Sequence, residues 1–182
     1  MGDVPAQVCF STTGTSGGSC TVLERVGSGA TLPYQTAEVK IVTSNEGNSV
    51  VVVEATFSGG GSGLAREVSL WVYDAPGDSF QRAFRFELSE LGSYQVVTSG
   101  PLTGYIMASD GIWLIGDEGH FDEHHFTIRL LGRPWNGSYR EVLPYVATRK
   151  YDSETADASV LNAEAPTIGR PLGLAYPPNG LP

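Results

Sequence analysis

The chain has 182 residues and a formal net charge of −9 at pH 7, from 20 acidic and 11 basic residues. This length is enough for one well-buried domain, and the acidic charge disfavours nucleic acid as a partner. The sequence also lacks the run of about 18 apolar residues that a membrane-spanning helix requires. We therefore expect neither a nucleic-acid partner nor a membrane partner.

The first part of the chain, residues 1–19, is mostly small and polar, and we predict a flexible N-terminal arm. It opens with "MGDVPAQVCF", which lacks the basic start and apolar core of a secretory signal. We therefore expect the protein to be made in the cytoplasm. Cys9 and Cys20 bracket a glycine- and serine-rich segment, and their spacing leaves open whether they are bonded. Free thiols are the default expectation for two cysteines in a cytoplasmic chain of this size.

Residues 20–149 show the two-residue period of β-strands. In "AFRFEL", residues 83–88, Phe84, Phe86 and Leu88 share one face, and "FTIRLL", residues 126–131, alternates in the same way. In "MASDGIWLI", residues 107–115, Asp110-Gly111 predicts the tight turn of a hairpin, because these residues readily adopt positive φ angles. About eight or nine such strands indicate an all-β fold, a single antiparallel β-sandwich of jelly-roll or Ig-like type. A β-barrel is the alternative.

The last segment, residues 150–182, carries five prolines and no sustained periodicity, and we predict an extended C-terminal arm. Its apolar side chains would be unfavourable in water, and prolines reduce the entropy lost when an extended segment docks. We expect the arm to lie on a neighbouring subunit, with its own sandwich as the alternative. The residues predicted to bind the partner are Leu161, Ile168, Leu172, Leu174, Tyr176 and Leu181.

The segment "GDEGHFDEHHF", residues 116–126, holds all three histidines and four carboxylates. In an extended strand His120, Asp122 and His124 share one face, while His125 points to the other. That set is short of the four ligands of a structural zinc site. No nucleophile motif or phosphate-binding loop accompanies it. We expect a polar loop with its histidines at the rim, without metal, cofactor or catalysis. A pH-sensing role near the histidine pKa is a variant.

Three aromatic residues are candidates for glycan binding. Alternation puts Trp71 and Tyr73 on the more polar face of their strand, and Trp135 lies in the turn-like "GRPWNGSY". Exposed rings at these positions would suit stacking on sugars. Burial is the favoured interpretation, with Trp71 under an arm or a second sheet and Trp135 closing one end of the sandwich.

Two functions remain. In general character the acidic, glycine-rich chain resembles the sandwich proteins of phage and viral particles, although no residue motif carries the resemblance. That implies a non-enzymatic capsid decoration (cement) protein, or a tail or fibre protein, assembled in the virion with other copies of itself or other particle proteins. The alternative is a carbohydrate-binding module. Only an assembly component gains from a long ordered arm, which favours the first function.

Overall fold

The computed structural model describes residues 6–11, 18–27, 30–43, 49–58, 64–97, 105–115, 119, 122–132, 140–152 and 156–170. The chain is mostly β, and its antiparallel sheets are not closed into a barrel. The predicted all-β, sandwich-like fold class is thereby confirmed. Two compact units are present, one of residues 1–42 and 49–90 and the other of residues 43–48 and 91–182. The described residues include no helix long and apolar enough to span a lipid bilayer.

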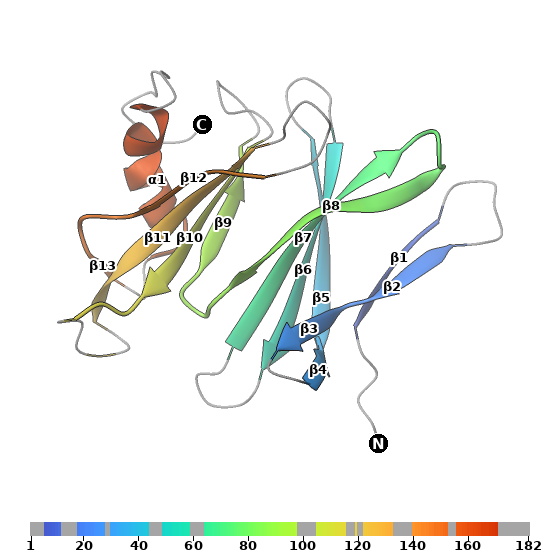
Figure 1. Cartoon of the computed structure of the whole chain (residues 1–182), viewed down its shortest axis with the longest axis horizontal. Helices are drawn as coiled ribbons and strands as arrows, with labels where there is room; N and C mark the ends of the chain where they lie inside the picture. The colour runs from blue at the N-terminus through green and yellow to red at the C-terminus, as the bar shows by residue number, and fades with distance from the viewer. Residues whose placement is uncertain are drawn as a thin grey trace. The chain divides into compact units, whose positions relative to one another are not determined.

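The first unit is built on a four-stranded sheet with strand order β5-β6-β7-β8 (Figure 1). Two short hairpins, β1-β2 and β3-β4, accompany it. The sheet strands are β5 (Thr36–Thr43), β6 (Ser49–Ser58), β7 (Leu64–Asp74) and β8 (Ser79–Leu88). The hairpin strands are β1 (Gln7–Phe10), β2 (Ser19–Val22), β3 (Glu24–Gly27) and β4 (Ala30–Pro33).

The alternation predicted for residues 83–88 is present in β8. Phe86 and Leu88 are buried, whereas Arg85 and Glu87 are exposed. Strand β7 pairs with β8 from Arg66 to Asp74, with one irregularity between Leu70 and Trp71. A two-residue period therefore sorts these side chains between an apolar and a polar face, as expected for a half-buried antiparallel strand.

The flexible N-terminal arm that we predicted is wrong for residues 7–10. Residues 7–10 form β1, which pairs with β2 so that Cys9 lies opposite Cys20, and a disulfide joins the two. The expectation of free thiols is therefore wrong. Val8 is buried in a core cluster with Trp71 of β7. Burial of Val8 and pairing with β2 stabilise this segment, and neither contact can be predicted from its composition.

The second unit contains a sheet with strand order β12-β11-β10-β9, and β13 pairs with β11. Helix α1 packs beside this sheet (Figure 1). The elements are β9 (Ser93–Val96), β10 (Ile106–Ile112), β11 (Glu123–Gly132), β12 (Arg140–Val146), β13 (Tyr151–Asp152) and α1 (Ala156–Gly169).

The hairpin predicted at Asp110-Gly111 is wrong. Both residues lie within β10, where Asp110 pairs with Thr127 and Gly111 pairs with Phe126 of β11. A Cβ atom at position 111 would lie 2.9 Å from the Cβ of Leu91. Glycine is required here because Leu91 approaches the backbone closely, which is the other common role of glycine in a strand.

The extended C-terminal arm is also wrong for residues 156–169, which form α1. Leu161, Ala165 and Ile168 recur at intervals of four and three residues, so they share one face of the helix. All three are fully buried in a core cluster with Phe126 and Ile128 of β11. This burial holds a helix that contains Pro166, a residue that weakens helices in isolation.

Candidate functional site

The histidine-rich segment enters β11 in the predicted register. His124 shares the buried face of Phe126 and Ile128, and His125 alternates with it as a half-buried residue. His124 is fully buried, with its ring centroid 4.5 Å from that of Trp113. The interpretation that all the histidines lie at a solvated rim is therefore wrong for His124, because its strand continues an apolar face.

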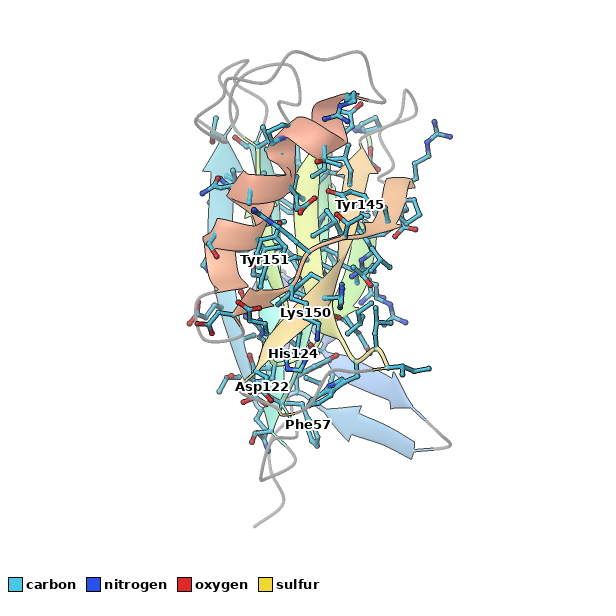
Figure 2. All side chains as sticks on the ribbon, turned by 90° about the vertical axis from the view of Figure 1, so that its left-hand side faces the viewer. Phe57, Asp122, His124, Tyr145, Lys150 and Tyr151 are labelled. Carbon is cyan, nitrogen blue, oxygen red and sulfur yellow. A yellow bond between two sulfur atoms is a disulfide. The ribbon has the colours of Figure 1, made fainter. Side chains whose placement is uncertain are left out.

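The candidate metal ligands do not assemble within the described residues. His120 lies outside the described part of the chain, Asp122 is exposed, and His124 is buried (Figure 2). Among the described residues, no three His, Cys, Asp or Glu side chains form a group that could hold a metal. The absence of metal, cofactor and catalysis stays a prediction.

Trp71 is only 5% exposed, as the favoured interpretation, burial, predicts, so it offers no platform for a glycan. Its ring centroid lies 5.1 Å from that of Phe10 in β1, and its Nε1–H donates a hydrogen bond of 3.0 Å to Ser69 Oγ. The N-terminal hairpin thus covers the indole. Tyr73 is 50% exposed, and its hydroxyl donates to Asp78. Trp135 lies outside the described residues.

The predicted partner-binding residues divide into two groups. Leu161 and Ile168 are fully buried against the sheet of their own unit. Their apolar surface is therefore buried within the chain. Docking on the chain's own sandwich was the less favoured of our two interpretations. The other four lie outside the described residues: Leu172, Leu174, Tyr176 and Leu181.

A buried carboxylate fastens α1 to two strands of the second unit. Glu164 of α1 is only 7% exposed. Tyr145 of β12 donates to its Oε2 over 2.7 Å, and Tyr151 of β13 donates to its Oε1. Figure 2 labels both tyrosines beside the helix. Burial and the hydrogen bond to Glu164 raise the pKa of Tyr145 above its ordinary value, and the same causes raise that of Tyr151 to about 12.

A pocket of about 300 Å³ opens beside this carboxylate. At neutral pH both phenols are protonated, well below their raised pKa values, and each donates a hydrogen bond to Glu164. The guanidinium of Arg149 stacks 4.5 Å from the ring of Tyr151. The contacts of Glu164 with Tyr145 and Tyr151 therefore hold α1 against the strands of its own unit. The pocket is lined by Tyr145, Thr148, Arg149, Ala163, Glu164 and Thr167.

The end of β10 presents an apolar tip that sequence reasoning missed. Trp113, Leu114 and Ile115 are 56%, 43% and 108% exposed, respectively. Asp122 and Glu123 at the start of β11 are exposed as well, and Ile112 pairs with His125, so acidic side chains lie near the tip. The signal was the apolar run "IWLI" at residues 112–115, which we instead assigned to one strand of a hairpin.

Strand β5 is a second exposed feature. It ends the strand order of its sheet, and every residue from Thr36 to Ile41 is exposed. Val39 and Ile41 are 56% and 73% exposed. An edge position depends on the order of strands in the sheet and is not visible in one segment of the sequence.

Comparison with known proteins adds no relative. A scan against protein-family models, a search of curated proteins and a search of solved structures each found no match.

Proposed function

We propose that the protein is a non-enzymatic assembly component that binds other protein subunits, and that the assembly is a virion, with the chain as a capsid decoration, tail or fibre protein. The exposed apolar tip, Trp113–Ile115, carries the proposal. Large apolar side chains in water cost free energy, and covering one fully contributes roughly 1.5–3 kcal/mol. Contiguous exposed apolar residues with a polar rim are typical of protein-binding surfaces.

The charge around the tip supports a protein partner. Exposed Asp122 and Glu123 lie at the start of the neighbouring strand, and the whole chain carries a net charge of −9. This field repels anionic lipid headgroups and nucleic acids and favours a partner surface with an apolar centre and basic rim. Burial of Trp71 removes the main support for the carbohydrate-binding alternative.

The proposed contact differs from the one that the sequence suggested. Leu161 and Ile168 are buried when α1 packs on its own unit. We therefore place the partner-binding residues at the tip of β10 and not in α1. Binding through the short tip requires no ordering of a long segment, so the entropy cost of ordering such a segment is avoided.

The test is incorporation of the double variant L114S/I115S into the native particle. Trp113 is retained, so its contact with His124 is left intact. We expect incorporation to fall at least tenfold, while the free energy of unfolding changes by no more than about 0.5 kcal/mol. The matched control is V146S, which replaces another exposed apolar residue of the same unit, 46% exposed. Unchanged incorporation of L114S/I115S would overturn the proposal.

A further inference from the structure

We propose that β5 pairs with β5 of a second copy of this chain, antiparallel and centred on Val39. The inference rests on the proposed function, because it names one partner of the assembly component. It concerns a different surface from the tip of β10, so each can be tested without the other.

The edge has the properties of a strand that accepts another. In the described part of the chain, no strand pairs with the outer side of β5. The strand has eight residues, "TAEVKIVT", five of them β-branched and none of them proline. An edge strand points backbone N–H and C=O groups of alternate residues outward, and these groups can form the ladder of a further strand.

Lysine on an edge strand commonly prevents pairing with other chains, but here an acidic residue accompanies it. Lys40 and Glu38 lie on the same face of β5, with Lys40 Nζ 3.7 Å from Glu38 Oε2. Lys40 also lies 3.8 Å from Glu54 of β6. Glu38 and Lys40 are 73% and 55% exposed, so both can reach across an open edge.

The two charges select one register. In an antiparallel pair centred on Val39, Glu38 lies opposite Lys40 of the second copy, and Lys40 lies opposite its Glu38. Opposite charges directly across a strand pair stabilise it, and like charges destabilise it. Centring on Glu38 or on Lys40 would place like charges opposite each other. A parallel pair in register would do so at both positions.

The same register also matches the apolar side chains. Val39 meets Val39 of the second copy on the two-fold axis, and Ala37 lies opposite Ile41. The exposed apolar area of Val39 and Ile41 is then covered by its own counterpart, as in a self-complementary two-fold interface. Two four-stranded sheets would join into one continuous sheet.

Cysteine cross-linking tests the register. In V39C the two new thiols lie opposite each other, within the range of about 4.5–5.5 Å between Cβ atoms of directly opposed residues, and we expect a covalent dimer under mild oxidation. In the matched variant I41C the new thiols lie on opposite sides of the axis, and we expect no covalent dimer. Peptide mapping verifies that the bond joins position 39 to itself. Equal cross-linking of the two variants, or none in V39C, would overturn the register.

Charge reversal tests whether the pairing of Glu38 with Lys40 stabilises the dimer. We expect sedimentation equilibrium to show a dimer for the native chain. E38K or K40E alone should weaken the dimer about tenfold or more, because each leaves like charges opposed. The double variant E38K/K40E should restore it, and a mixture of the two single variants should form a heterodimer. E141K, the same reversal at an exposed residue of β12, should leave the dimer unchanged. A monomer at every concentration, or a dimer insensitive to both single reversals, overturns the inference.

The results separate the two proposals. A chain that joins particles but never pairs through β5 would contradict this inference and leave the proposed function standing. A chain that dimerises through β5 but belongs to no particle would do the reverse.

Discussion

Tyr145 of β12 donates a hydrogen bond to the buried carboxylate of Glu164 on α1, with 2.7 Å between the phenol oxygen and Oε2. Tyr151 donates to the other carboxylate oxygen. A helix that sequence reasoning placed on a neighbouring subunit is thereby held by its own unit. This pairing makes the docking of α1 testable by substitution.

Replacing Glu164 should loosen the helix. E164A removes the acceptor of two hydrogen bonds and leaves two half-buried phenols without it, so we expect the free energy of unfolding to fall by roughly 1–3 kcal/mol. E164Q, which keeps an acceptor oxygen and the side-chain shape, should cost less. Urea denaturation followed by circular dichroism measures both. An E164A protein as stable as the native chain would show that this carboxylate does not hold α1.

Alkaline pH should weaken the same cluster. The pKa of Tyr151 is raised to about 12 by burial and by its hydrogen bond to Glu164, against 10.0 for the free side chain. Because the folded state holds the proton of Tyr151 more tightly than the unfolded state does, this residue contributes its full stabilisation below pH 10. The contribution is lost as the pH rises from 10 through about 12. We expect Y151F to lose less stability over this range. Parallel pH profiles for the two proteins would contradict the assignment.

Buried Glu67 should make the stability of the fold depend on pH in the acid range. Burial raises its pKa above the ordinary 4.5, and the charges of Arg85 and Arg82 offset part of that effect. Stability linked to this residue is greatest when it is protonated, and it falls as the pH rises from 4.5 through the folded pKa. E67Q stays neutral, so we expect its stability relative to the native protein to rise from pH 4 to pH 7. Thermal unfolding at both values measures this, and a relative fall in E67Q would contradict it.

The disulfide between Cys9 and Cys20 should stabilise the N-terminal hairpin. Its sequence separation is 11 residues, and a loop of this order constrains the unfolded chain by roughly 2–3 kcal/mol. We expect reduction to lower the free energy of unfolding by about that amount, measured in urea with and without reductant. In the control variant C9A/C20A, reductant should have no effect. Identical curves for the native chain would indicate that its cysteines are not bonded in solution.

The sequence predicts individual strands well because side-chain alternation is a local property. The alternation of Phe86 with Arg85, and of His124 with His125, is present as expected. The hairpin turn predicted at Asp110-Gly111 is wrong because a turn and a close backbone approach both favour glycine. Leu91, the residue that approaches Gly111, is 20 residues away in the sequence. Only the packed structure distinguishes the two roles.

The helix and the candidate sites depend on contacts between distant segments. Pro166 and the later prolines indicated an extended arm, but burial of Leu161 and Ile168 outweighs the helix-breaking tendency of one proline. Trp71 was an equivocal case, because its exposure depends on whether Phe10 covers it. The edge position of β5 likewise follows from strand order, which no single segment encodes.

The central claim is that the chain works as a subunit of a larger protein assembly. Cross-linking mass spectrometry on native particles, combined with their copy number, tests it most directly. We predict several copies per particle, with cross-links from the tip of β10 to a neighbouring subunit. Recovery of the chain solely as a free monomer, with no cross-link to any other polypeptide, would contradict the account.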